Sequence, residues 1–286
     1  MAETGFGPEQ SMDLTEALKE VRGTAVPGIS VGIQAALPVE EKRDELYAAA
    51  GCGPAGFGIT GTDLGPTGWD FTGLIETFQA QTPSDVAQYF ASAGPRELSR
   101  GISRSYESEL KTGAGPEKDA VVVEVTQILI NAPFHVLQKM IPAEEWGLNL
   151  AHRLGGEVRV VEKGADGRAV RQLERMVLSG VPFAAVDCSL INQDMTKAEL
   201  IRYGEDSTKV YWRVYRSDND STKVDIGSVE FRAYDATSVL VTFYSAHRLR
   251  GLEFLPKVAK RALSQTFLDH AQRYKSLVEG NGGADF

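Results

Sequence analysis

A run of segments with alternating apolar and polar side chains constrains the fold of this chain most strongly. Along 209–216, for example, Val210, Trp212 and Val214 occupy every second position. A period of two is typical of a β-strand with one buried face. Short polar turns such as 164–167 and 204–207 favour hairpins, so we expect an antiparallel meander. The predicted strands of this run are 157–163, 169–178, 183–191, 195–203, 209–216, 222–234 and 238–249.

The chain ends in a long amphipathic helix, predicted for 255–279. Its apolar residues recur three or four positions apart, as Leu263, Phe267 and Ala271 do. Pro256 stands in the first turn and Gly280 just past the end, where these residues are favoured. At 1.5 Å per residue the helix is roughly 37 Å long. It is therefore long enough to lie across a whole curved sheet.

The part of the chain before this meander divides at a linker-like stretch, 111–119. Residues 1–119 hold most of the glycine and proline and the whole net charge of −9, whereas acidic and basic residues balance in 120–286. We expect a mostly helical and loop-rich N-terminal region, 1–119, and a domain, 120–286, that folds alone. In the first we predict helices at 13–21, 38–50, 84–92 and 95–110, a short strand at 28–35 and mostly loop over 51–73. The second is predicted to open with a strand at 121–130 and helices at 133–140 and 143–151.

Composition excludes several classes of function. An acidic chain is poorly suited to nucleic-acid binding, which depends on neutralising phosphates. The two cysteines, Cys52 and Cys188, predict neither a disulfide framework nor a zinc site, and we expect no metal and no cofactor.

The GxGxxG pattern at 51–56 follows a helical stretch rather than a strand, which favours a glycine-rich loop over a dinucleotide site. No signal peptide or membrane span is predicted, so we expect a cytoplasmic protein.

Two stretches carry a resemblance to a known family. Residues 128–136, Ile-Leu-Ile-Asn-Ala-Pro-Phe-His-Val, are similar to a first strand that runs into a first helix, and 267–279 are similar to a last helix. With the order of elements, they resemble the START/SRPBCC superfamily over 120–280. This superfamily includes START lipid-transfer domains, birch-pollen-allergen-like proteins and polyketide cyclase/dehydratase-like proteins. Its members usually have six strands after the helices, where we predict seven.

The resemblance implies an α+β helix-grip fold, in which a curved antiparallel sheet wraps on the long C-terminal helix. It also implies a cavity between the two that holds a hydrophobic small molecule or a lipid, and a concave apolar pocket is a usual kind of ligand site. Strand alternation indicates which side chains point toward the helix. The candidate ligand-binding residues are Thr126, Val210, Trp212, Val214, Val229, Phe231, Val241, Phe243, His247 and Phe267.

Glu124 and His247 are the candidate catalytic residues. In the family the first and last strands pair antiparallel, which places the end of the last strand, near His247, beside Glu124. A histidine beside a carboxylate in an apolar cavity can exchange protons, because burial and mutual charge shift both pKa values. The alternative is a surface glutamate and a structural histidine.

Basic residues gather around the start of the last helix. This cluster would attract an anionic head group or make transient contact with an anionic membrane. A solvated face is the favoured interpretation. Its members are Arg248, Arg250, Lys257, Lys260 and Arg261.

Three functions follow from these patterns. The first is binding or carriage of a lipid or other hydrophobic molecule. The second is a polyketide cyclase/aromatase-like enzyme, which a convergent set of polar cavity residues would favour. The third is a regulatory interaction module, which exposed apolar surface on helices 84–92 or 95–110 would favour. The sequence does not distinguish oligomeric states.

Overall fold

The computed structural model describes residues 69–111, 118–140, 153–179, 192–217, 222–249 and 256–280. The other residues include the predicted helices 13–21, 38–50 and 143–151, the predicted strands 28–35 and 183–191, and the glycine-rich motif at 51–56; these lie outside the described residues. The elements in chain order are α3 (Thr72–Ala80), α4 (Ser84–Ala91), α5 (Pro95–Arg100), β1 (Ile102–Leu110), β2 (Asp119–Ile130), α6 (Phe134–Met140), β3 (Arg153–Lys163), β4 (Ala169–Ser179), β5 (Asn192–Tyr203), β6 (Ser207–Ser217), β7 (Thr222–Ala233), β8 (Val239–Leu249) and α8 (Pro256–Gly280).

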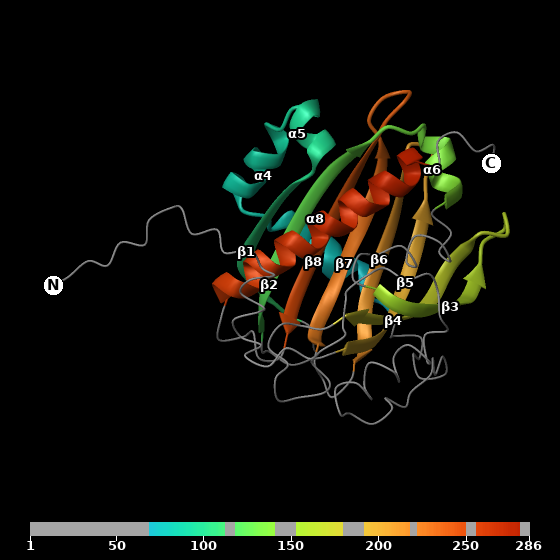
Figure 1. Ribbon diagram of the computed structural model, residues 1–286. Coiled ribbons are helices and arrows are strands. Elements are labelled where there is room, and N and C mark those ends of the chain that lie inside the picture. Colours follow the sequence, from blue (N-terminus) through green and yellow to red (C-terminus); the bar gives the residue numbers. More distant parts are fainter. Residues whose placement is uncertain are drawn as a thin grey trace, which may run out of the picture.

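One antiparallel sheet organises the described residues. Its strand order is β1-β2-β8-β7-β6-β5-β4-β3, so β3 to β8 form a meander whose last strand pairs with β2. Figure 1 shows α8 lying diagonally across one face of this sheet. The predicted helix-grip fold is thereby confirmed. Six strands follow α6 among the described residues, and the seventh predicted strand, 183–191, lies outside them.

The two faces of the sheet have separate apolar layers. On β2, Ile128 and Ile130 pack with α8 residues such as Phe267, whereas Val123 and Val125 belong to a second cluster on the other side. We call these sides the α8 face and the α3 face. Alternation within each strand thus supplies two buried layers, as a sheet that is covered on both sides requires.

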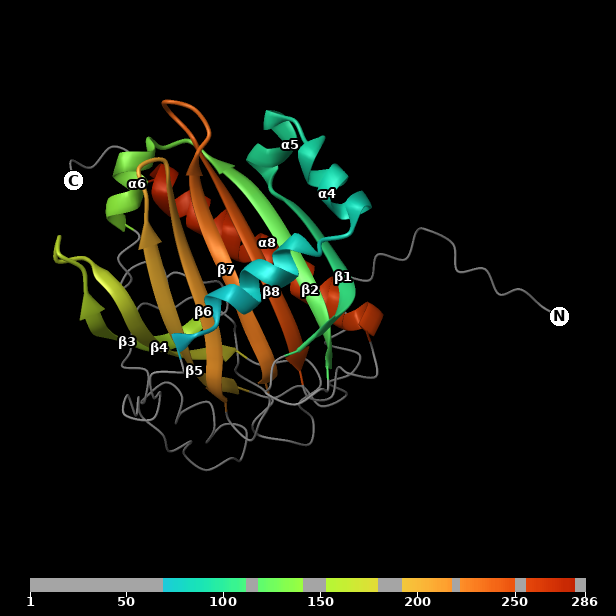
Figure 2. The same ribbon diagram turned by 180° about the vertical axis from the view of Figure 1, so that it is seen from behind.

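Helix α3 covers the second face of the sheet. The sequence analysis predicted mostly loop up to residue 73 and did not predict this helix. Phe71, Ile75 and Phe78 recur at helical spacing, are buried, and pack with the valines of β2. Figure 2 shows α3 lying across the strands on the side opposite α8. The sheet is therefore the middle of three layers.

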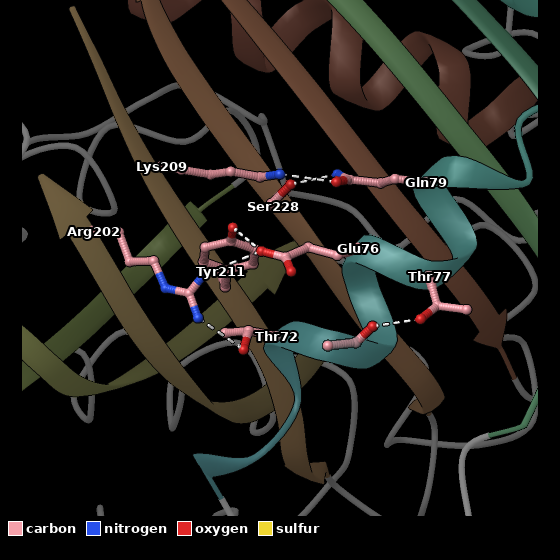
Figure 3. A network of polar contacts seen from close by, with 9 residues as sticks. Thr72, Glu76, Thr77, Gln79, Arg202, Lys209, Tyr211 and Ser228 are labelled. Atoms are coloured by element: carbon pink, nitrogen blue, oxygen red, sulfur yellow. Dashed lines mark hydrogen bonds and ion pairs between the residues drawn. The ribbon is translucent and has the colours of Figure 1, made fainter. Parts of the chain in front are cut away.

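Polar contacts also fasten α3 to the sheet (Figure 3). Glu76 accepts hydrogen bonds from the Tyr211 hydroxyl at 2.7 Å and from Arg202 at 3.0 Å. The hydrogen bond from Tyr211 is the main cause that lowers the pKa of the Glu76 carboxyl. Gln79 accepts from Lys209 at 2.8 Å and donates to Ser228 at 2.7 Å. These contacts orient the helix over β5, β6 and β7.

The predicted helix 95–110 is wrong over most of its length. Helix α5 ends at Arg100, and Ile102–Leu110 form β1, which pairs with β2 from Gln127 to Asp119. Gly101 makes the change of direction with a φ of +82°, in a region that side chains disfavour. A Cβ at Gly101 would also lie 2.6 Å from Leu268 Cδ1 of α8. Glycine at this position therefore ends the helix and lets α8 approach.

The division of the chain at residue 119 stays a prediction. Strand β1 lies before that boundary, yet it is part of the sheet, and α3 buries the α3 face. We therefore propose that the folded unit begins before α3. Among the described residues, no helix combines the length and the apolar character needed to cross a membrane.

Candidate ligand site on the α8 face

Most of the predicted ligand-binding residues lie together on the α8 face. One cluster of buried side chains joins residues of β6, β7 and β8 to the apolar side of α8, and its predicted members are Val210, Trp212, Val229, Phe231, Val241, Phe243 and Phe267. Phe243 and Phe267 meet edge to face with ring centroids 6.0 Å apart. Val214 is half-buried, and Thr126 is wholly buried. Their role in binding a ligand stays a prediction.

Glu124 of β2 is wholly buried on this face and is surrounded by hydroxyl groups. It accepts hydrogen bonds from Ser103 of β1 at 2.6 Å, from Thr126 at 2.8 Å and from Ser264 of α8 at 2.6 Å. Burial raises the pKa of the Glu124 carboxyl to about 7, although these three hydrogen bonds oppose the rise. The group can therefore hold or release a proton near neutral pH.

His247 lies on the neighbouring strand, as predicted, but its partners differ from those of Glu124. The register places His247 opposite Val122 and places Ser245 opposite Glu124. His247 Nε2 lies 2.8 Å from Ser245 Oγ, and Nδ1 lies 3.6 Å from Asp225 Oδ1. Burial lowers the pKa of the imidazole, and Asp225 opposes that shift only in part. The two candidate catalytic residues thus sit in adjacent but separate polar groups.

A third polar group on the α8 face was not predicted. Gln172 and Glu174 of β4 lie directly opposite Glu199 and Lys197 of β5, and all four side chains are buried. Lys197 Nζ lies 2.8 Å from Glu174 and 2.7 Å from Glu199, and Gln172 donates a hydrogen bond to Glu199. The amide oxygen, Gln172 Oε1, has no hydrogen-bond partner among the described residues. We call these four residues the β4–β5 cluster.

The protonation of this cluster follows from burial and mutual charge. Burial alone would lower the pKa of Lys197, but Glu174 and Glu199 raise it above its usual range. Burial raises the pKa of Glu199 to about 7, Lys197 opposes the rise, and Glu174 adds to it. Lys197 is therefore a permanent cation between two carboxylates, of which Glu199 can take up a proton near neutral pH.

Trp212 of β6 contacts both the polar group of His247 and Asp225 and the β4–β5 cluster. Its indole Nε1 donates to Asp225 Oδ1 at 2.9 Å, and Lys197 Nζ lies 5.7 Å from the ring. The ring lies over Gly227, where an added Cβ would be 2.6 Å from a ring carbon. A glycine opposite Trp212 is thus needed for the ring to lie against the sheet.

One sequence signal could have revealed the β4–β5 cluster. Met195, Lys197, Glu199 and Ile201 share a period of two, and the first and last are apolar and buried. Two charged residues inside an apolar strand face indicate a buried ion pair. The identity of their partners needs the β4–β5 register, which a single sequence does not give.

The basic residues at the start of α8 are partly engaged in ion pairs. Arg248 bonds to Asp119, and Lys260 Nζ lies 2.8 Å from Glu107. Lys257 and Arg261 are exposed, and Arg250 lies outside the described residues. Contact with a membrane stays a prediction. In the described ranges no group of His, Cys, Asp and Glu side chains is arranged to hold a metal ion.

Comparison with known proteins finds similar folds among solved structures. Neither the family models nor the curated proteins compared with this sequence give a match. A START superfamily protein from Mycobacterium smegmatis is 11% identical, with 55% of this chain and 97% of that chain covered and a TM-score of 0.42. Human StAR-related lipid transfer protein 5 is 10% identical, with 71% and 99% covered and a TM-score of 0.42. The Zhui aromatase/cyclase from a Streptomyces species is 11% identical, with 64% and 98% covered and a TM-score of 0.38. The solved structures found by this comparison thus include START proteins.

Proposed function

We propose that the protein binds a hydrophobic small molecule between the sheet and α8, and that the β4–β5 cluster holds a hydrogen-bond donor of that molecule. The supporting observation is the acceptor Gln172 Oε1, which is buried and has no hydrogen-bond partner in the part of the chain that the structure describes. A buried polar atom without a hydrogen bond costs about 1–3 kcal/mol. A ligand hydroxyl or ammonium at this position would remove that cost.

The charges of the cluster support the same interpretation. Burying three ionisable side chains is expensive, and well-packed apolar residues often give equal or greater stability. One ammonium lies between two carboxylates, and the carboxylate oxygens and Gln172 Oε1 accept hydrogen bonds but cannot donate them. The apolar side chains of the α8 face would then bind the hydrocarbon part of the ligand, and the cluster would favour a neutral or cationic donor over a carboxylate.

The test compares amphiphiles of equal chain length by titration calorimetry: decanol, decylamine and decanoate. We expect the alcohol and the amine to bind and decanoate to bind at least tenfold more weakly. Gln172→Met removes the free acceptor and should weaken decanol binding about tenfold, the value of one hydrogen bond. Gln127→Met is the matched control, because Gln127 bonds to Thr242 instead. Failure of all three amphiphiles to bind would refute the proposal, and equal binding of decanoate would refute the role of the cluster.

The polyketide cyclase/aromatase-like enzyme is the second candidate. Polar side chains gather on the α8 face, and Glu124 and Glu199 both have a pKa of about 7, which suits groups that exchange protons. Turnover of an aromatic polyketide analogue that Glu124→Gln abolishes, without loss of binding, would support this candidate.

The interaction module stays a prediction with less support. Val161 and Tyr234 are the large apolar side chains with high exposure among the described residues, at 49% and 45%. Neither belongs to α4 or α5, where exposed apolar surface would have favoured this function.

A further inference from the structure

Three polar side chains lie next to one another on the α8 face. Ser245 and His247 are two residues apart on β8, so their side chains leave the sheet on the same face. Asp225 of β7 lies directly opposite His247 in the strand register. Ser245 Oγ is 2.8 Å from His247 Nε2, and His247 Nδ1 is 3.6 Å from Asp225 Oδ1. A hydroxyl, an imidazole and a carboxylate therefore follow one another in the order of a nucleophile, its base and the group that orients the base.

The protonation of this set suits those roles. Burial lowers the pKa of the His247 imidazole from its ordinary value, which favours the neutral form. In the tautomer that carries its hydrogen on Nδ1, the nitrogen on the side of Asp225, His247 Nε2 accepts a hydrogen bond from the Ser245 hydroxyl. The Trp212 indole donates to the same Asp225 oxygen, at 2.9 Å, and so fixes the carboxylate.

Other hydroxyls on this face are arranged differently. Ser103, Thr126 and Ser264 donate to Glu124, which is a carboxyl acceptor rather than an imidazole. Ser245 differs from these three residues because its hydroxyl lies beside an imidazole. Phe267 packs on His247 with ring centroids 5.3 Å apart, and Phe243 packs on Phe267. The surroundings of the set are therefore apolar.

We propose that Ser245, His247 and Asp225 hydrolyse an ester with an apolar acyl chain, as nucleophile, general base and positioning carboxylate. The inference rests on the proposed function, because the ester has to lie between the sheet and α8. The apolar rings beside His247 would contact the acyl chain, and exclusion of water there would strengthen the polar contacts.

The reaction balances with water as the second reactant. Ser245 Oγ forms a bond to the ester carbonyl carbon while its proton passes to His247 Nε2. The bond from that carbon to the alcohol oxygen then breaks, and His247 gives the proton to the leaving alcohol. Water attacks the acyl-serine, passing one proton to His247. When the bond to Oγ breaks, that proton returns to Ser245, and a carboxylic acid leaves.

The first experiment needs no variant. The whole protein is treated with an alkyl fluorophosphonate, which reacts with activated serines, and the label is located by peptide mass spectrometry. We expect labelling at Ser245 that 4-nitrophenyl decanoate competes away. Absence of label, or label only at other residues, would overturn the proposal.

Kinetics on three variants provide the second experiment. We expect Ser245→Ala and His247→Gln to lower kcat for 4-nitrophenyl decanoate by at least about 100-fold. Thr242→Val is the control, because Thr242 lies on the same strand but bonds to Gln127 on β2. Thermal unfolding is measured for each variant to check that it is folded. Wild-type turnover that Ser245→Ala leaves unchanged would assign the activity to another nucleophile and overturn the proposal.

Two further measurements test the role of Asp225 and the binding of a ligand separately. Asp225→Asn should lower kcat about 100-fold or more while KM changes little, because Asp225 orients His247 without touching the ester. Decanol, which has no ester bond to hydrolyse, reports binding alone. Binding of decanol without ester turnover would refute the hydrolase and leave the proposed function standing, whereas failure of both decanol and decylamine to bind would refute both.

Discussion

At the scale of single residues, Glu124 joins three elements through one carboxyl group. The hydroxyls of Ser103, Thr126 and Ser264 come from β1, β2 and α8 and meet at this side chain. Alternation along β2 predicted that Glu124 faces α8. Its partners were not predictable, because Ser103 lies in a segment that was expected to be helical, and the rotation of α8 is not determined by its apolar periodicity alone.

Glu124 should make stability depend on pH. Its pKa is raised from 4.5 to about 7 in the folded state, so the fold binds this proton more tightly than the unfolded chain does. The resulting stability is present below about pH 4.5 and is lost as the pH rises through 7. We expect the free energy of unfolding of the wild type to fall by up to about 3 kcal/mol relative to Glu124→Gln over this window. Urea titrations at several pH values measure the difference.

Glu199 titrates in the same pH window, but it is present in both the wild type and Glu124→Gln and lowers the stability of both equally. The difference between the two proteins therefore isolates Glu124. Glu109→Gln, at an exposed position of β1, is the control for removal of a surface carboxylate. A difference between the wild type and Glu124→Gln that does not change with pH would show that Glu124 is not buried as described.

Gly101 allows a second comparison at this scale. Both Gly101 and Gly167 have a φ near +80°, but a Cβ meets Leu268 only at Gly101 and meets nothing within 4 Å at Gly167. Gly167→Ala should cost about 1–2 kcal/mol through backbone strain alone. Gly101→Ala should cost about 1–3 kcal/mol more through overpacking against α8. Thermal melts of the two variants measure this, and equal losses would contradict the contact.

At the scale of elements, periodicity predicted those elements that are long and have one buried face. The strands β4 to β8 and helix α8 agree with the predicted ranges to within three residues at each end. Helix α3 was missed because its three buried aromatic and aliphatic residues follow a glycine-rich stretch and span only two turns. Strand β1 was missed because the helix predicted from Pro95 was extended too far. Pro95 correctly indicates the start of α5, but Gly101 ends that helix just six residues later.

Helix α3 should contribute strongly to stability despite its nine residues. Ile75 is wholly buried against the α3 face, so Ile75→Ala should cost about 2–5 kcal/mol by leaving a cavity. Thr77→Ala, on the exposed side of the same helix, is the control and should change stability by about 0.5 kcal/mol or less. Chemical denaturation measures both. Similar small losses for both variants would mean that α3 does not pack on the sheet in solution.

At the scale of the whole molecule, the sheet separates two layers with different contents. The α3 face combines apolar side chains with polar contacts that hold α3, such as Glu76 with Arg202. The α8 face instead buries Glu124, the set of Ser245, His247 and Asp225, and the β4–β5 cluster among apolar residues. A helix covers each face, but these buried ionisable side chains lie on the α8 face, and the candidate site is therefore placed there.

The same arrangement predicts where the folded unit begins. A fragment of residues 120–286 lacks β1 and α3, which exposes Val121, Val123 and Val125 and leaves β2 as a sheet edge. It also loses the burial of Phe71, Ile75 and Phe78, each of which contributes about 1.5–3 kcal/mol. Their sum is comparable to the total stability of a typical domain, about 5–15 kcal/mol.

We therefore expect residues 120–286 to show no cooperative thermal transition, contrary to the domain boundary predicted from composition. Residues 69–286, which retain both elements, should unfold cooperatively. Calorimetry of the two fragments beside the whole chain measures this. A sharp transition in 120–286 would restore the boundary at residue 119 and show that the α8 layer alone stabilises the sheet.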